Sequence, residues 1–315
     1  MRDYIVRRLL LIPVTLLIVS FLVFSLSRMI PGDVVDIMYA DKGYAKDKEE
    51  MREKLGLNLP LHIQYASWIG DMFKGDWGES LWSREPVLEE IGKRWPVTLE
   101  LGLFSLVIAL TLALPIGIIS AIRQDSAIDY LLRSYSIATL SIPSFWIALL
   151  IILVPTLWFP AWRVAPPFIH FSEAPLENLR NMILPAFCLG GALSGTIMRM
   201  VRTMMLEVLR QDYIRTAWAK GLRERVVIVR HALKNAMVPV VTLIGAQIMV
   251  VIGGSVLIEE IFGLPGLGQH MFHSIMQRDY PMVSGINLIL ASAVVLLNLV
   301  VDLSYAYLDP RIRYR

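Results

Sequence analysis

The sequence has 315 residues, of which 56% are hydrophobic and 18% are charged, and its formal net charge is +3. Soluble domains carry roughly a quarter charged residues, so the composition argues against a water-soluble protein and favours a membrane protein. The net charge is too small to indicate a nucleic-acid partner, and we expect none. The single cysteine, Cys188, excludes a disulfide within the chain.

Six stretches are long and apolar enough to cross a bilayer as helices, which takes about 20 residues. They lie at about 9–27, 97–121, 134–159, 182–200, 239–258 and 283–303. The first is too long for a signal-peptide core and lacks a small-residue cleavage site, so we expect an uncleaved span. Pro115, Pro143 and Pro155 fall inside spans and predict kinks. Gly191 and Gly195 have the spacing that allows close approach of another helix.

The segment 31–96, between the first two spans, is too long and too mixed in charge to be a plain linker. Residues 47–55 predict a helix, and Trp77, Trp82 and Trp95 are typical of anchors at a membrane surface. Two interpretations stay open: a small structured cap on the outer face, and a docking surface for an external partner.

Lysine and arginine predict the orientation of the spans. Nine of them fall between residues 199 and 234, and more gather at 2–8 and 311–315, whereas the short loops 160–181 and 259–282 hold few. Long segments cross the membrane largely regardless of charge, so the charges of the short loops determine the predicted orientation. The pattern predicts that both termini are cytoplasmic and that 31–96 is extracytoplasmic.

A basic run at 206–239 interrupts the apolar second half of the chain. Leu206, Leu209, Tyr213 and Ala217 recur at helical spacing, and a second apolar stripe begins after Gly221. Helix, glycine and helix predict a compact hairpin at the membrane surface. It is either a positively charged loop and nothing more, or an element shaped to fit a groove on a soluble partner.

Motifs for chemistry are missing from the sequence. It has no G-x-x-x-x-G-K-[ST] run for ATP, no H-E-x-x-H pair and no G-x-S-x-G elbow, so we expect no enzyme activity, cofactor or metal on this chain. His270 and His273 lack supporting ligands and are better explained as ordinary polar residues. Asn298 and Asp302 share one face of the sixth span, where pairing of Asp302 with an inner arginine is favoured over an ion or proton site.

Several short runs within the hairpin match a known pattern: Met-Leu-Glu-Val-Leu at 205–209, Asp-Tyr-Ile-Arg-Thr-Ala at 212–217 and Ala-Lys-Gly-Leu at 219–222. Further landmarks include Pro31-Gly32-Asp33, Gly75-Asp76-Trp77-Gly78 and Arg278-Asp279-Tyr280-Pro281. Together they resemble, over nearly the whole chain, the ABC-importer permeases of the dipeptide/oligopeptide/nickel branch, in particular the first, B-type permease. The hairpin resembles their EAA loop, although Trp218 stands where an arginine is common.

The resemblance implies an all-α, type I ABC-importer permease fold with six transmembrane helices. The implied divisions are 1–30 (tail and first helix), 31–96 (extracytoplasmic segment), 97–305 (permease core, with the coupling loop at about 206–238) and 306–315 (cytoplasmic tail). It also implies a set of residues that couple the loop to an ATPase: Glu207, Asp212, Tyr213, Ile214, Arg215, Thr216, Ala217, Lys220, Gly221 and Leu222.

The partners implied by the resemblance are a second permease subunit, two cytoplasmic subunits that bind ATP and Mg²⁺, and an extracytoplasmic solute-binding protein. The expected location is the cell membrane and the expected cargo is a peptide, while similar permeases import nickel chelates, glutathione or oligosaccharides. The alternative class is a secondary transporter or channel that works alone, which would more often show an internal repeat. Dependence on partner ATPases distinguishes the two classes.

Overall fold

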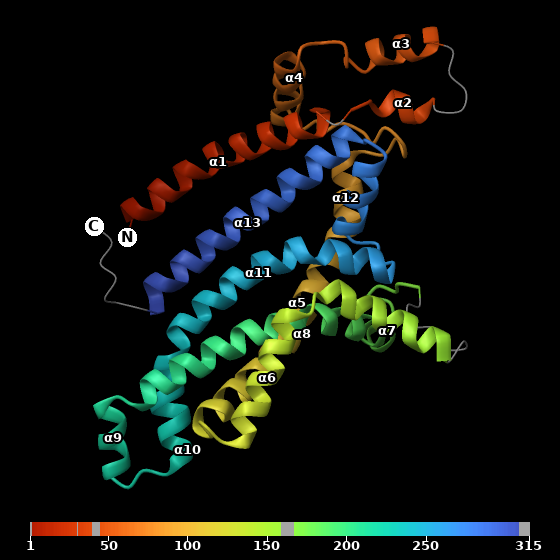
Figure 1. Cartoon of the computed structure of the whole chain (residues 1–315). Coiled ribbons are helices and arrows are strands. Elements are labelled where there is room, and N and C mark those ends of the chain that lie inside the picture. The colour runs from red at the N-terminus through yellow and green to blue at the C-terminus, as the bar shows by residue number, and fades with distance from the viewer. Residues whose placement is uncertain (1, 30, 40–44, 159–166, 309–315) are drawn as a thin grey trace. The chain divides into compact units, whose positions relative to one another are not determined.

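The computed structural model describes all residues except 1, 30, 40–44, 159–166 and 309–315, and it describes only the backbone at 2–8, 45–46 and 302–308. Helices joined by short turns make up the described part of the chain (Figure 1), where the one extended pairing is an isolated bridge between Glu79 and Pro86. The chain divides into two compact units. Unit 1 comprises Met1–Pro96 and Pro265–Leu296, and unit 2 comprises Val97–Leu264 and Leu297–Arg315.

Within the described residues, five helical segments are long and apolar enough to cross a membrane. They belong to α1 (Arg2–Met29), α5 (Val87–Ile122), α8 (Pro175–Leu209), α11 (Lys234–Phe262) with the short helices that lead into it, and α13 (Tyr280–Leu308). A sixth crossing results if α6 (Ala127–Ser141) and α7 (Ser144–Trp158) form one bent span. The prediction of an all-α membrane protein is confirmed, with five to six candidate spans.

The third predicted span, 134–159, is broken rather than continuous. α6 ends before Ile142, whose backbone is extended (φ −98°, ψ 119°), and α7 runs at 92° to α6. Pro143 explains the break, because its ring disfavours helical backbone at the preceding residue and it has no N–H to continue the helix. The sequence predicted only a kink here. Pro155, in contrast, is retained inside α7.

Unit 1 gathers α1, the first turns of α5, most of α13 and four short helices: α2 (Val34–Met38), α3 (Ala45–Lys54), α4 (Leu61–Phe73) and α12 (Leu267–Met276). One apolar cluster of this unit joins α5, α12 and α13 through Val87, Leu267 and Met282, and Trp77 and Trp95 pack against it. These two tryptophans therefore contact the protein's own core. The segment 31–96 is structured, and α5 starts at Val87, well before the predicted beginning of the second span.

The turn between α1 and α2 is fixed to the start of α13. Gly32 has φ +81°, and a Cβ at this position would lie 2.7 Å from Nη1 of Arg278. Arg278 donates through Nη2 to the carbonyl of Pro31. The neighbouring Asp279 is buried and accepts from Oγ of Ser80, and burial raises the pKa of its carboxyl group even though this hydrogen bond lowers it. Two of the sequence landmarks, 31–33 and 278–281, thus meet in one contact.

Unit 2 is built around α8, which packs against α6, α7 and α11. Its buried face repeats every three or four residues, as a helix surrounded by helices requires: Met182, Ala186, Leu189, Leu193, Ile197, Val201 and Met205. Gly195 lies against α6, where an added Cβ would be 3.0 Å from the carbonyl oxygen of Ser136, and Gly190 lies against Ser105 of α5. Gly191, which the sequence paired with Gly195, has open space around it.

This contrast between glycines gives a prediction for the packing of α6 on α8. Gly195→Ala forces the two helices apart, because the new Cβ overlaps Thr139 and the backbone of α6. We expect a loss of roughly 1–3 kcal/mol in the free energy of unfolding, measured by thermal or denaturant unfolding in detergent. Gly191→Ala is the matched control and should leave stability unchanged or slightly improve it. Equal effects of the two substitutions would contradict the described helix contact.

Candidate functional site

The basic run forms a helical hairpin that projects from the end of α8 (Figure 1). α9 (Asp212–Ala219) follows α8 after a two-residue joint, and α10 (Glu224–Val226) and the π-helix η1 (Val227–Leu233) return the chain directly into α11. The reversal occurs at Gly221, whose φ of +71° is the left-handed conformation that glycine adopts without strain. Its N–H donates to the carbonyl of Trp218 at 2.9 Å, closing the last turn of α9. The predicted glycine break is confirmed.

One face of the hairpin is buried in the core of unit 2. Ile214 is fully buried and Ala217 is 6% exposed, and they belong to the same apolar cluster as Val227, Ala232 and Met205. Burying an aliphatic side chain such as Ile214 contributes roughly 1.5–3 kcal/mol. α9 is therefore packed against the end of α8 and against η1 and does not form a free loop.

A polar contact locks α9 to the returning helix. Asn235 donates through Nδ2 to Oη of Tyr213 at 2.8 Å and to the carbonyl of His231 at 3.1 Å. The hydroxyl of Tyr213 also reaches the carbonyl of His231, at 3.5 Å. The sequence identified Tyr213 but did not place Asn235 in the site, because nothing in a local pattern pairs two residues that are 22 positions apart.

The other face of the hairpin is exposed and mixes charge with large apolar groups. Tyr213 and Trp218 are 42% and 45% exposed, and Leu222 is 36% exposed. Around them lie the exposed residues Asp212, Arg215, Thr216 and Lys220. Arg215 contacts Asp212 at 3.4 Å on the surface, a pair that adds little stability. An apolar patch with a polar rim is typical of a surface that meets another protein.

The structure brings most of the predicted site residues together in one part of unit 2. Residues 212–222 form one continuous element, and Glu207 lies just before it on α8, at a hollow also lined by Arg202 and Arg210. Asn298 is on α13, apart from the hairpin in the chain, and its side chain is half-buried. The side chain of Asp302 lies outside the described residues, so its predicted pairing with an inner arginine stays a prediction.

A buried ion pair near the hairpin is not predicted by any pattern in the sequence. Arg202 of α8 donates from Nε and Nη2 to the two carboxylate oxygens of Asp129 on α6, at 2.9 and 2.7 Å. Ser120 of α5 donates to the same carboxylate, which is fully buried. The sequence places Arg202 only among the nine basic residues between 199 and 234. The signal that could have marked Asp129 is its position three residues after Ser126, which caps the start of α6.

In the part of the chain that the structure describes, no group of three or more His, Cys, Asp or Glu residues gathers in an arrangement that could hold a metal ion. Nε2 of His270 lies 3.5 Å from Oε2 of Glu90. Burial lowers the pKa of His270 to about 4, with help from the nearby Arg94. The imidazole is therefore neutral at pH 7, and its contact with Glu90 is a polar contact rather than an ion pair.

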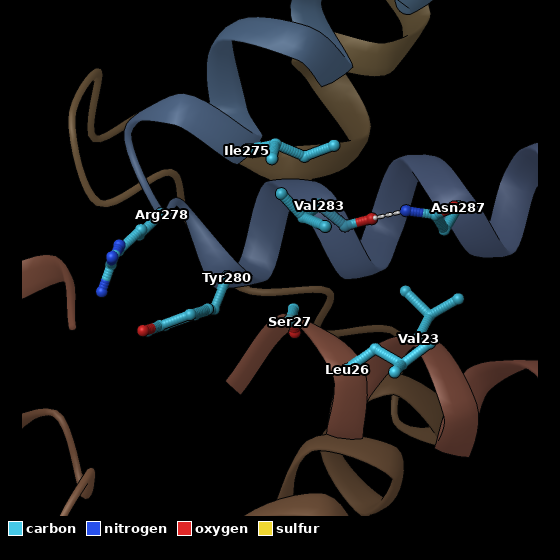
Figure 2. Close-up of a pocket in the computed structure, with 8 residues that line it drawn as sticks. All are labelled: Val23, Leu26, Ser27, Ile275, Arg278, Tyr280, Val283 and Asn287. Carbon is cyan, nitrogen blue, oxygen red and sulfur yellow. Dashed lines mark hydrogen bonds between the residues drawn. The ribbon is translucent and has the colours of Figure 1, made fainter. Parts of the chain in front are cut away.

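Unit 1 contains an apolar hollow of about 220 Å³ between α1 and α13. Figure 2 shows Val23 and Leu26 of α1 on one side and Val283 and Asn287 of α13 on the other. The side-chain amide of Asn287 donates to the carbonyl of Val283 at 2.8 Å. Because this donor is satisfied within its own helix, the hollow presents mainly hydrocarbon, as a surface that faces lipid does.

Comparison with known proteins gives consistent matches over the whole chain. Residues 113–314 match the family described as "Binding-protein-dependent transport system inner membrane component", and residues 1–102 match the N-terminal family of the same systems. The chain is 42% identical to the oligopeptide transport system permease protein AppB of Bacillus subtilis (strain 168), over 100% of each chain. It is 37% identical to the dipeptide transport system permease protein DppB of Escherichia coli (strain K12), also over 100% of each.

Among solved structures, a chain from the crystal structure of an amino acid ABC transporter with histidines resembles this one with a TM-score of 0.50. The match covers 71% of this chain and 95% of that chain at 14% sequence identity. At this identity the likeness concerns the fold alone.

The buried ion pair generates a prediction with an internal control. Asp129→Ala leaves the guanidinium of Arg202, a side chain that is only 17% exposed, without its partner, and we expect the free energy of unfolding in detergent to fall by roughly 3–5 kcal/mol. The double substitution Asp129→Leu with Arg202→Met removes both charges and should recover most of that loss. Asp212→Ala, at the exposed pair with Arg215, should cost less than about 1 kcal/mol. If Asp129→Ala costs no more than Asp212→Ala, the pair does not hold α6 to α8.

Proposed function

Because the chain belongs to the family of binding-protein-dependent transport system inner membrane components, we propose that α9, α10 and η1 couple ATP hydrolysis on a partner subunit to transport through its spans. The chain is a multi-pass permease subunit of an ABC importer in the plasma membrane, and this family is not itself catalytic. The coupling residues are those of the hairpin, from Asp212 to Leu222, with Glu207 at its base.

The observation that carries this proposal is the division of the hairpin into two faces. Ile214 and Ala217 are buried against the protein's own core, whereas Trp218 and Leu222 are exposed between charged residues. A short amphipathic helix whose apolar groups remain uncovered is suited to a groove on a second protein. Such a groove on a cytoplasmic ATPase would bury Trp218, at the position where the sequence departs from the related pattern.

The connections of the hairpin give it a way to move the spans. α8 leads into α9 through Arg210 and Gln211, and η1 continues into α11 without a break. A displacement of the hairpin therefore acts on two long helices at once. ATP-driven closure of the ATPases would bias the permease between inward-facing and outward-facing arrangements, as a two-state element responds to a partner that prefers one state.

The remaining subunits follow from the same proposal. One chain offers one hairpin, so an importer with two ATPases needs a second permease, which we propose to be a related chain in a heterodimer. The hairpin and both termini lie on the cytoplasmic side, as the arginine and lysine pattern predicts, and α2 to α4 lie on the outer side, where an external solute-binding protein would deliver cargo. The names of the relatives AppB and DppB support a di- or oligopeptide as that cargo.

Gly221 provides the sharpest test of coupling within the chain. Gly221→Val places a β-branched residue at φ +71°, which costs of order 1–3 kcal/mol of backbone strain, although no atom lies within 4 Å of the new Cβ. We expect peptide uptake by the full complex in proteoliposomes to fall at least about fivefold while the ATPases still hydrolyse ATP. Gly221→Asn, which tolerates this conformation, should keep most of the uptake.

A matched control for this experiment is Gly263→Val. Gly263 also has a positive φ (+64°) and open space around it, but it ends α11 far along the chain from the hairpin. It should not separate ATP hydrolysis from uptake. Undiminished uptake by well-expressed Gly221→Val would contradict the coupling role of the turn.

The proposal for the whole assembly is tested by purification and reconstitution. The tagged chain, extracted in mild detergent, should copurify with a second permease and with one or two ATPases that carry the P-loop motif. In proteoliposomes the complex should take up a labelled dipeptide only with ATP and the solute-binding protein. A chain that purifies alone and transports without ATP would instead be a stand-alone transporter.

A further inference from the structure

A basic hollow of about 270 Å³ lies between α6 and α8 in unit 2, at residues that the coupling function does not use. Its lining combines three arginines with two hydroxyl and two apolar side chains: Arg133, Arg199, Arg202, Ser136, Thr203, Ile137 and Met198.

The hollow is framed by two fixed contacts between the helices. At one end Oγ of Ser136 donates to the carbonyl of Gly195 at 2.9 Å, and at the other Arg202 binds Asp129 at 2.7 Å. These contacts are two helical turns apart on each helix, or roughly 10 Å, and the pairing shows that the helices run antiparallel. Arg133 lies between the two contacts on α6, at the level of Arg199 on α8. The hollow is therefore built into the helix pair.

The two arginines in the middle of the hollow are available to a ligand, whereas Arg202 is engaged by Asp129. Arg133 and Arg199 are both exposed. Among the described residues, neither has a carboxylate within 4 Å, and the guanidinium of Arg133 lies 5.7 Å from the ring centroid of Tyr130. Two guanidinium groups that face one site without an acidic partner attract an anion, and their planar donors match the oxygens of a phosphate group.

The position of the hollow along the spans favours a lipid over a soluble anion. Arg133 lies in α6 just before the predicted span 134–159, which the structure breaks at Pro143, and Arg199 lies next to the end of the predicted span 182–200. The predicted spans therefore place both arginines near the boundary of the hydrocarbon layer, where lipid headgroups are found. One turn along α6 from Arg133, Ile137 is 63% exposed, and Leu140 beyond it is 41% exposed. This apolar strip runs from the basic group into the hydrocarbon.

We propose that the hollow binds one anionic phospholipid, whose phosphate group contacts Arg133 and Arg199 and whose acyl chain lies along Ile137 and Leu140. Basic pockets between transmembrane helices on the cytoplasmic side are suited to such headgroups. A free phosphate ion is an anion like the headgroup, but it has no acyl chain that could pack on the apolar strip. The inference depends on the proposed function only for the orientation, which assigns the lipid to the cytoplasmic leaflet.

Native mass spectrometry of the purified full-length chain tests the inference without ATPases or transport, so its failure would leave the proposed coupling untouched. Phosphatidylglycerol is added to the detergent micelles, with phosphatidylcholine of the same acyl chains as the zwitterionic comparison. We expect the wild-type chain to retain one phosphatidylglycerol in preference to phosphatidylcholine. Arg133→Gln with Arg199→Gln should weaken this retention roughly tenfold or more, while Arg133→Lys with Arg199→Lys should keep most of it.

The charge-matched control is Arg123→Gln with Arg225→Gln, which removes two exposed arginines outside the hollow and should retain the lipid as the wild type does. Gel filtration of each variant confirms that the chain is folded and monodisperse. Equal retention by the Arg133/Arg199 glutamine variant and the wild type would overturn the proposal, as would equal retention of phosphatidylcholine. Displacement of phosphatidylglycerol by millimolar inorganic phosphate would also overturn it, because the ligand would then be the free anion.

Discussion

The buried ion pair between Asp129 and Arg202 is the interaction on which the hairpin end of unit 2 depends. Taking two charges out of water costs several kcal/mol for each ion, and only good geometry with further hydrogen bonds offsets that cost. Here the contact is bidentate, and Ser120 and the backbone N–H of Asp125 also donate to the carboxylate. Three helices, α5, α6 and α8, are therefore tied together a short distance before α8 passes into the hairpin.

In the proposed coupling, this ion pair lets the hairpin act on the long helices to which it is connected. The hairpin is anchored by the buried Ile214 and by the hydrogen bond between Tyr213 and Asn235, so in the proposed coupling we expect it to move as one body. In that proposal α8 would carry the displacement toward the pair with Asp129, and η1 would carry it into α11. A π-helix at that junction is uncommon and is often found at functional sites. The exposed Trp218 and Leu222 provide the surface through which a partner would push.

Local features of this fold were predictable from sequence, and contacts between distant residues were not. The apolar stretches of the sequence locate the five to six candidate spans, because the bilayer itself demands about 20 such residues. The reversal at Gly221 followed from two helical stripes on either side of one glycine. The ion pair joins residues 73 positions apart, which no periodicity reveals. At Pro143 the sequence predicts only a kink, because prolines inside spans are often tolerated. The angle of 92° between α6 and α7 depends on how these helices pack, which a local pattern does not reveal.

The extensive burial of α8 has a consequence for how the chain enters the membrane. α8 is the least apolar of the five unbroken candidate spans among the described residues and the one most deeply buried in its own protein. A translocon that tests each segment against lipid would accept it least readily, since its face with Gly190, Gly191 and Gly195 gains little from hydrocarbon. Ser120, Asp129 and Ser136, which bind Arg202 and Gly195, all precede α8 in the chain. By the time α8 is synthesised, the helices that can shelter its polar groups are already made, so its insertion can proceed against protein rather than against lipid alone.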